Sequence, residues 1–543
     1  MKFRIVFAGP DDQIPRVEPK RAEISESAPR RYDKEGDGMV RYDRTRGGET
    51  RTTRLANFTA QIVRDLVVDE DRDHRQFEIH AKLAGHAQRI LISANAFQRM
   101  HWVLDRLGPG AIVYPGQQQH LRAAIQALSG SIVQERIFSH LGWRKLGGEW
   151  IYLHAGGAID ARGARSDLQV LIPAALCHYH PVVPVDANDR LAAIRGSIEF
   201  LSLAADRITI PLLAGVYRAA LGGLDYSLFL VGQSGTFKST LASLCQQHFG
   251  SAMDGSHLPA NFASTANALE ELAYAAKDAL LTVDDFVPIQ GAGDGALHAL
   301  AERLFRAAGN RQGRNRLAGA TRLDTGHPPR ALMLATGEAL PRGHSLQARL
   351  LTIHIRPGDV HRDRLSECQR NGHHGQLAMA MGAFLMWVAN HYEEIQTRIA
   401  QRILEVRSTF QQHGLHPRIP SAMADLQAGW DIFLQFGLET GAINLAKQKE
   451  LQSRSHIAFR ELCRSQAREQ ADHHPLISSA ASKKTDVVEM MKRPDGASVT
   501  EIMSRTNWQR HTVFGFVSNL KRNSKATVES RKTVRGERRY WII

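Results

Sequence analysis

The sequence of 543 residues predicts an α/β protein with a parallel sheet at its centre, a smaller α+β module before it and helices after it. From about residue 185, continuous apolar strands alternate with segments of helical spacing, which is typical of a parallel sheet covered on both faces. The last 60 or so residues hold three short helical segments and a hairpin. That pattern is the outline of a winged helix-turn-helix.

The composition allows a large folded core and favours a polyanionic partner. Hydrophobic residues make up 43% of the chain and charged residues 23%, and the formal net charge is +14. The four cysteines form no CxxC pair, which argues against a zinc ribbon. The most apolar stretch, residues 378–390, is too short to span a bilayer, and the apolar run at the start is too short for a signal peptide. The sequence therefore predicts a cytoplasmic protein without a membrane partner.

The chain divides into six predicted segments. Residues 1–54 have mixed charge and few aliphatic side chains, which predicts a disordered or extended tail. Residues 55–184 alternate apolar and polar residues and contain a hairpin around Gly147–Gly148, so we expect an α+β module. The other predicted segments are an ATPase core at 185–375, a helical lid region at 376–463, a linker at 464–482 and a winged helix at 483–543.

A glycine-rich turn in the core carries the strongest chemical signal. It follows the apolar strand at 226–231 and precedes a helix, so its backbone N–H groups and the helix N-terminus can surround phosphates. A lysine can then reach the β and γ phosphates of ATP, and a serine can hold Mg²⁺. Phe237 stands where such loops usually have glycine. The expected nucleotide-binding residues are Gly232, Gln233, Ser234, Gly235, Thr236, Phe237, Lys238, Ser239 and Thr240.

Two further strands of the core end in polar residues. The strand at 279–283 leads into Asp284, which would hold Mg²⁺ with Ser239, and Asp285, which would orient the attacking water. The alternative is a strand that happens to end in two acids. The strand at 331–335 leads into Thr336, which could contact the γ-phosphate or the water, or simply form a turn.

Arginines supply the other candidates in the core. Arg349 precedes the strand at 350–355 and is the candidate for an arginine finger, since arginine stabilises the charge spread over a transferring phosphoryl group. The alternative is a surface arginine. Arg311, Arg314 and Arg316 belong to a basic, glycine-containing run that could contact a nucleic-acid backbone or form a solvated face. The histidine clusters lack the spacing of a zinc site.

The C-terminal segment is strongly basic. Residues 483–543 contain 14 Lys or Arg and 6 Asp or Glu, a net charge of +8, which favours DNA over a protein partner. Its third helix opens with the residues expected to face bases or phosphates, namely Gln509, Arg510, His511 and Thr512. The residues expected to meet phosphates along the helix end and the wing are Lys521, Arg522, Arg535, Arg538 and Arg539.

Five segments carry a family resemblance: GWRKLGGEWIYLHAGGAI, GQSGTFKST, KDALLTVDDFVP, AAGNRQGRNR and ATGEALPRGHSLQARLL. Over residues 55–440 the chain resembles the domain-of-unknown-function family numbered nine-two-seven, P-loop ATPases of bacterial mobile elements. Relatives include replicative helicases of staphylococcal cassette elements, which look like the MCM branch of AAA+ proteins. The resemblance implies a hexameric ring with nucleotide sites between subunits, Thr336 at a sensor position where Asn is usual, and Arg349 as the finger acting on a neighbouring subunit. The C-terminal segment from Lys483 onward resembles a small winged-helix family that is also common on mobile elements.

Three functions compete at this stage. The first is an ATP-driven DNA helicase or translocase, acting on single-stranded or duplex origin DNA in the replication of a mobile element. The alternative is an ATP-switched DNA-binding initiator or regulator that unwinds nothing, which would suit slow hydrolysis caused by Phe237 and Thr336. A third, an ATPase that remodels proteins, fits the basic C-terminal segment less well.

Overall fold

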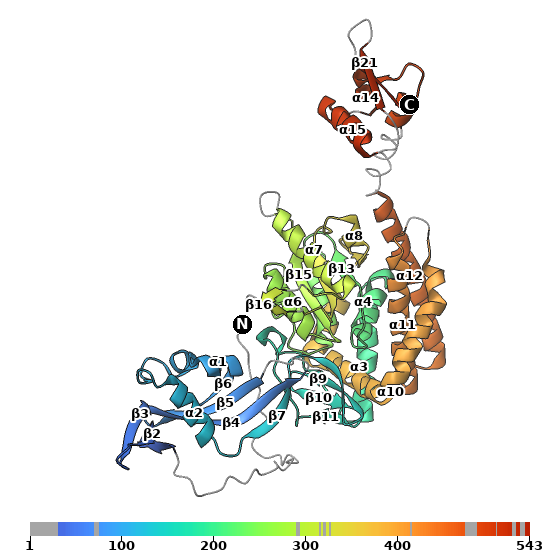
Figure 1. Ribbon diagram of the computed structural model, residues 1–543. Helices are drawn as coiled ribbons and strands as arrows, with labels where there is room; N and C mark the ends of the chain where they lie inside the picture. Colours follow the sequence, from blue (N-terminus) through green and yellow to red (C-terminus); the bar gives the residue numbers. More distant parts are fainter. Residues whose placement is uncertain are drawn as a thin grey trace. The chain divides into compact units, whose positions relative to one another are not determined.

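The computed structural model describes residues 31–69, 75–288, 294–313, 316–318, 322–324, 327–412, 415–472, 486–506, 508–523, 528–532 and 538–542 (Figure 1). The chain forms two compact units. The first comprises the chain up to Phe410 together with Pro417–Leu462, and the second comprises Gln411–His416 together with the chain from Cys463 onward. Within the described residues, no helix has the length and apolar character needed to cross a bilayer.

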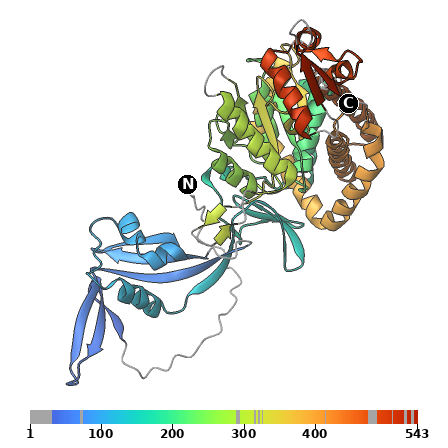
Figure 2. The ribbon, with the colours of Figure 1, turned by 45° about the horizontal axis from the view of Figure 1, so that its top comes forward.

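The first unit begins with an α+β module built on two sheets. Antiparallel β1-β2-β3 forms a ribbon, and the second sheet has the order β12-β7-β4-β5-β6 (Figure 2). The buried cluster of the module includes Met39, Leu55, Phe58 and Trp102. The elements are β1 Tyr32–Glu35, β2 Gly38–Arg44, β3 Thr50–Ala56, β4 Phe58–Asp69, β5 Arg75–Leu83, β6 His86–Ser93, α1 Ala94–Arg99, the π-helix η1 Val103–Leu107, α2 Gln118–Leu128, β7 Val133–Phe138 and β12 Gln169–Val170.

The prediction of a tail over residues 1–54 is wrong for its described part. Residues 32–54 form β1, β2 and most of β3, and β3 continues across the predicted boundary to Ala56. Met39 and Val40 of β2 are buried, so this ribbon contributes to the core of the module despite its many charged residues. Residues 1–30 lie outside the described residues.

A four-stranded antiparallel sheet, β11-β10-β9-β8, joins this module to the core of the unit. The pairing of β8 with β9 confirms the predicted hairpin, whose turn glycines, Gly147 and Gly148, both have positive φ. Two buried donors fix the sheet to the core: Trp143 Nε1 donates to Ala220 O at 2.6 Å and Tyr152 OH to Asp278 O at 2.8 Å. The elements are β8 Gly142–Leu146, β9 Glu149–His154, β10 Gly157–Asp160, β11 Gly163–Arg165 and η2 Ala174–Leu176.

The core contains the predicted parallel sheet, with the order β14-β15-β18-β13-β19. All five residues of β13 are buried, and α4 lies on one side of the sheet while α6 and α7 lie on the other (Figure 1). The strands are β13 Ser227–Val231, β14 Ala260–Asn261, β15 Leu280–Phe286, β18 Leu332–Gly337 and β19 Leu350–His354, with a separate hairpin of β16 Arg316–Ala318 and β17 Arg322–Asp324. The helices are α3 Ala187–Glu199, η3 Phe200–Leu203, α4 Asp206–Ala219, α5 Lys238–Gln247, α6 Ala266–Ala275, α7 Asp294–Asn310 and α8 His344–Gln347.

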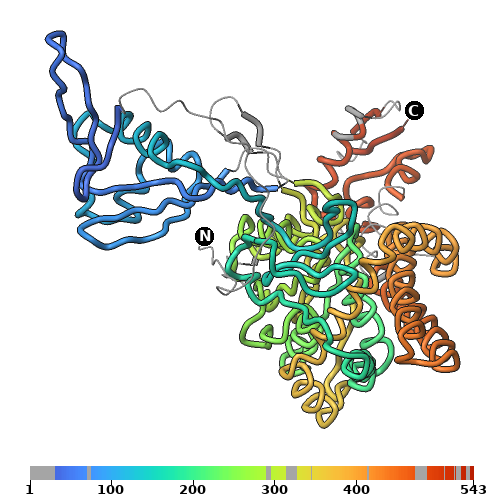
Figure 3. The backbone as a smooth tube through the Cα atoms, turned by 90° about the horizontal axis from the view of Figure 1, so that it is seen from below, coloured from blue at the N-terminus to red at the C-terminus, as the bar shows by residue number. Residues whose placement is uncertain are grey.

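Helices follow the sheet, as the sequence predicts, and Figure 3 traces them in yellow and orange after the green core. They are α9 Arg362–His373, α10 Gln376–Val406, η4 Arg407–Phe410, α11 Arg418–Glu439 and α12 Leu445–Asp472. The backbone of α10 is non-helical at His391, where the helix kinks. The prediction of a linker from residue 464 is wrong for residues 464–472, because α12 continues to Asp472; Gln466 and Gln470 are buried there. Residues 473–482 lie outside the described residues.

The C-terminal part of the second unit contains the three expected helical segments and the hairpin. They are a helix over residues 486–491, α14 Val499–Thr506, α15 Arg510–Asn523, β21 Val528–Lys532 and β22 Arg538–Ile542. A short strand that the sequence did not predict, β20 Ala497–Ser498, pairs with β22. Ser498 and Glu501 cap α14 reciprocally, since each side chain accepts the other residue's backbone N–H. Val487, Ile502, Val513 and Tyr540 belong to the small core that holds these elements together.

Candidate functional site

The predicted phosphate loop lies between the carboxyl end of β13 and the start of α5. A Cβ on Gly232 would collide with the carbonyl oxygen of Ile355, so this position requires glycine. Gly235 has φ +78°, a conformation that glycine adopts without strain. Phe237 has φ +65° at the N-cap of α5, so a bulky residue holds the left-handed conformation that glycine usually supplies here.

Two side chains of the loop bond to the same backbone oxygen. Thr236 Oγ1 donates to Gln233 O at 2.7 Å, and Lys238 Nζ donates to the same oxygen at 2.8 Å. The lysine therefore closes over its own loop, at the place where a phosphate loop holds anions. The loop residues 234–240 line a cavity of about 280 Å³ together with Asp285, Val287, Thr336, Gly337 and Glu338.

Three strand ends bring the predicted catalytic residues together beside this loop. Ser239 Oγ donates to Asp284 Oδ1 at 2.9 Å, and Thr336 Oγ1 donates to the same carboxylate oxygen. Thr336 Oγ1 also accepts the backbone N–H of Asp285 at 3.2 Å. This contact is possible because β18, which carries Thr336, lies between β13 and β15 in the sheet. The serine hydroxyl and the carboxylate are hard oxygen donors of the kind that Mg²⁺ prefers, so these residues fit a magnesium ion.

Sequence reasoning gave no role to two charged residues at or near this cavity. Glu338 lines it immediately after β18, and the signal for it was its place two residues beyond Thr336 at the same strand end. Arg362, the first residue of α9, holds its guanidinium 5.7 Å from the centre of the Phe237 ring. This distance is within the range of a cation–π contact. No local pattern in the sequence indicates that α9 begins beside the phosphate loop.

Arg349 is not brought to this cavity. It precedes β19, and its carbonyl oxygen accepts the N–H of Ser227, the first residue of β13. Arg349 therefore lies at the amino-terminal end of the strands, whereas the loop follows their carboxyl end. Its guanidinium donates to Asn310 Oδ1 at 2.8 Å and to Ser345 Oγ at 2.9 Å. Partial burial, and the charges of Arg418 and Arg306, lower the pKa of Arg349.

The predicted DNA-contacting residues fall into three groups. Gln509, Arg510, His511, Thr512 and Arg538 are exposed. Arg539 is instead bound within its own unit: it donates to Asp495 O at 2.8 Å and forms an ion pair with Glu501 at 3.0 Å. Arg311 donates to the backbone oxygens of Gly223 and Leu224 in the first unit. The positions whose side chains lie outside the described residues are Arg314, Arg316, Lys521, Arg522 and Arg535.

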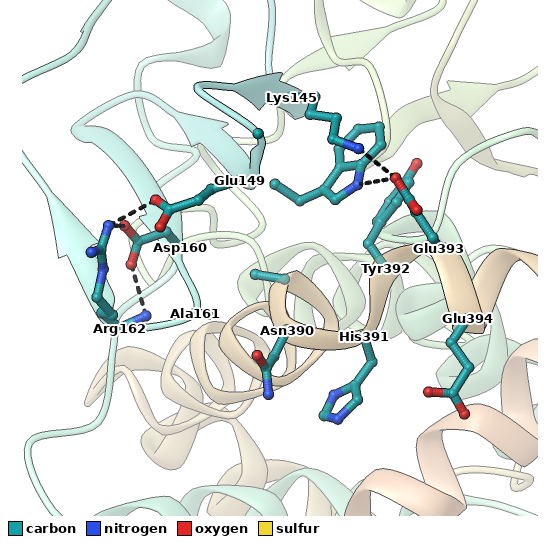
Figure 4. Close-up of a pocket in the computed structure, with 13 residues that line it drawn as sticks. Lys145, Glu149, Asp160, Ala161, Arg162, Asn390, His391, Tyr392, Glu393 and Glu394 are labelled. Carbon is teal, nitrogen blue, oxygen red and sulfur yellow. Dashed lines mark hydrogen bonds and ion pairs between the residues drawn. The ribbon is translucent and has the colours of Figure 1, made fainter.

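A second cavity, of about 420 Å³, lies where the β8–β9 hairpin meets the kink of α10 (Figure 4). Trp150 stacks on Tyr392 with ring centres 4.0 Å apart, and Lys145 and Trp150 both donate to Glu393, at 2.6 and 3.3 Å. The hydrogen bond from Lys145 is the main cause that lowers the pKa of Glu393. These contacts tie the hairpin to the helix just after its break at His391.

Two parts of the chain match known protein families. Residues 213–318 match a family described as a domain of unknown function, DUF927, and residues 478–542 match a protein family of unknown function, DUF3489. The first match contains the phosphate loop and both aspartates, and confirms the family resemblance over part of the range 55–440. No curated protein matches the chain.

One solved structure similar to this chain is described as the active helicase Cch of an SCCmec type IV element. The sequences are 13% identical, the match covers 96% of this chain and 98% of the other, and the TM-score is 0.50. At this identity the likeness concerns the fold alone. The two chains therefore share a mixed α/β fold over nearly their whole lengths.

Proposed function

We propose that this protein is an ATP-dependent DNA helicase or translocase, an AAA+ ATPase that acts as an oligomeric ring in the replication of a bacterial mobile element. The observation that carries the proposal is the hydrogen-bonded set of Ser239, Asp284 and Thr336 beside a phosphate loop. The family match over residues 213–318 and a full-length fold likeness to a protein described as an active helicase support it. The cytoplasm of the bacterial host is the expected compartment.

The residues divide the work of ATP hydrolysis. The backbone N–H groups of residues 233–239 and the N-terminus of α5 receive the phosphates, and Lys238 leaves Gln233 O to contact the β and γ phosphates. Ser239 and Asp284 would hold Mg²⁺, which supplies charge neutralisation at the phosphates. Asp285 orients the water that attacks the γ-phosphorus. The bond from that phosphorus to the β–γ bridging oxygen breaks, ADP leaves with the electron pair, and the proton of the water passes to the released phosphate. Thr336 fixes the Asp284 carboxylate from the neighbouring strand end.

The position of Arg349 supports an assembly of several subunits. Arg349 lies at the amino-terminal end of the strands, and its own phosphate loop follows their carboxyl end. It can therefore reach a transferring phosphoryl group only on another copy of the chain. A ring, by family resemblance a hexamer, places such an arginine at each interface. The hydrogen bonds that the guanidinium donates to Asn310 Oδ1 and Ser345 Oγ hold it in a fixed direction until then.

The second candidate is an ATP-switched DNA-binding initiator without unwinding activity. The left-handed backbone at Phe237 favours it. A strained residue next to Lys238 is suited to a loop that switches between two conformations and hydrolyses ATP slowly. In both candidates the basic C-terminal elements act as a winged helix that binds DNA.

The test is ATP hydrolysis by the purified full chain without DNA, with single-stranded DNA and with duplex, beside Lys238→Ala. A motor predicts hydrolysis that single strands stimulate and that the variant loses, followed by unwinding of a forked duplex. Stimulation by duplex alone, with no unwinding, would select the initiator. Hydrolysis that neither DNA changes would contradict both and leave protein remodelling.

A further inference from the structure

An exposed aromatic side chain stands in the middle of the basic C-terminal elements. Phe514 on α15 is 39% exposed, although its neighbours Val513 and Val517 are buried in the small core. The aromatic residues Trp508 and Phe516 pack on that core and on one another, with ring centres 5.2 Å apart. Phe514 is therefore not needed to fill the core and points to the other face of the helix.

The surface around Phe514 has two further features. Arg510, one helical turn earlier, holds its guanidinium 5.8 Å from the centre of the Phe514 ring, so the pair presents a positive and an apolar group side by side. Gly515 follows Phe514, and a Cβ at that position would meet no atom within 4 Å. A glycine within an exposed helix lowers helix stability, and no packing contact among the described residues requires it. Its effect is to let another molecule approach the backbone beside Phe514.

We propose that Arg510 and Phe514 read base pairs of duplex DNA that lie one or two steps apart in the major groove, Arg510 a guanine and Phe514 the 5-methyl group of a thymine. The net charge of +8 over residues 483–543 selects a polyanion over a protein partner. Arginine pairs with guanine through two hydrogen bonds, and an apolar side chain contacts the thymine methyl. Four residues of helix advance about 6 Å, which corresponds to one or two base pairs.

This inference rests on the proposed DNA-binding function but not on ATP hydrolysis. The full chain is used to select duplexes from a random pool without ATP, and binding of the enriched duplex is measured by fluorescence anisotropy. The expected site contains a guanine and a thymine one or two steps apart. Exchanging that thymine for deoxyuracil removes only its methyl group, and should weaken binding about fourfold, as expected for one lost methyl contact.

The variants make the assignment specific. Phe514→Ala should weaken binding to the thymine duplex and be indifferent to the exchange for deoxyuracil, whereas Phe514→Leu should stay sensitive to it. Arg510→Ala should weaken binding on the order of tenfold and lose the preference for guanine. Gly515→Ala should raise the melting temperature and nevertheless weaken DNA binding, because a methyl group then separates the helix from the groove. The melting temperature of each variant reports whether it is folded.

Three results would overturn the proposal. First, the wild-type protein binds equally well when each enriched thymine in turn is exchanged for deoxyuracil. The chain then binds DNA but does not read the methyl group. Gly515→Ala that binds DNA as well as wild type shows that this face does not meet DNA. A chain that enriches no duplex, while it hydrolyses ATP, assigns the Phe514 face to a protein partner and leaves the ATPase proposal intact.

Discussion

The cavity beside the phosphate loop and the exposed face of α15 are built differently. Beside the cavity, Ser239 and Thr336 are both hydrogen-bonded to Asp284, and the strand order of the sheet fixes their positions. On α15, Arg510 and Phe514 lie exposed, with the guanidinium 5.8 Å from the centre of the ring. A site for chemistry requires groups held in place before the ligand arrives, whereas a surface that reads DNA can order its side chains on binding.

The largest expected effect is a loss of ATP hydrolysis without any loss of DNA binding. Lys238→Ala should lower the rate of ATP hydrolysis on the order of a hundredfold or more, because the phosphates lose their positive partner. The same variant should bind the selected duplex in the absence of ATP as wild type does. Phosphate release and anisotropy measure the two properties, with exposed Lys449→Ala as a control that should change neither. A parallel loss of DNA binding would show that the two regions are not independent.

A smaller effect tests whether the cavity is held in place by its hydrogen bonds. Thr336→Val keeps the shape of a side chain that is 1% exposed but removes the hydroxyl that bonds to Asp284 and Asp285 N–H. We expect hydrolysis to fall on the order of tenfold, since leaving such groups unpaired costs about 1–3 kcal/mol. Thr336→Ser restores the hydroxyl and should recover most of the activity. Equal activity of both variants would contradict a role for this bond.

Acid should weaken the helix of the phosphate loop before it weakens α15. Burial lowers the pKa of His248, at the C-cap of α5, from 6.5 to about 4. The unfolded chain therefore binds a proton that the folded chain does not, and stability present above pH 6.5 is lost as the pH falls toward 4. At pH 5.5 the loss is about 1 kcal/mol. The protection of backbone amides against hydrogen exchange, relative to the intrinsic exchange rate at each pH, should fall in α5 and not in α15. Equal changes in both helices, or none in α5, would contradict this.

The smallest effect distinguishes structural from DNA-contacting arginines on neighbouring positions. Arg539→Ala should destabilise the C-terminal unit by about 1 kcal/mol, because it removes bonds to Asp495 O and Glu501. The exposed Arg538→Ala should leave the melting temperature unchanged and reduce the salt dependence of DNA binding by about one phosphate contact. Reversed results for the two variants would move the DNA-contacting role to Arg539.

The sequence predicted the parts of the site that depend on neighbouring residues. The phosphate loop, the strand before it and the two aspartates follow from local composition, and the structure has these strands where they were expected. That Thr336 bonds to Asp284 depends on β18 lying between β13 and β15, which no local pattern encodes. Arg362 reaches Phe237 for the same reason, through the packing of a helix from a distant part of the chain.

The errors in the fold have a common physical cause. Strands β1–β3 and the end of α12 contain many charged or polar residues, so their hydrophobic pattern is weak. They are stabilised by pairing and packing with other elements: Met39 and Leu55 enter a core shared with β4 to β6, and Gln466 and Gln470 are buried. Composition alone assigns such segments to tails and linkers, because it does not include the surface that covers them.

The strand order of the core also determines when β13 can pair with its neighbours during translation. Both neighbours of β13 come late in the chain: Leu228 pairs with Leu334, and Ser227 pairs with Leu350. At about 5–20 residues per second, the ribosome makes the last partner roughly 6–25 seconds after β13 itself. Until β18 is made, a strand of five core residues has neither neighbour, which is the kind of segment that aggregates or recruits a chaperone. The strand that leads into the phosphate loop is thus synthesised well before the sheet that protects it.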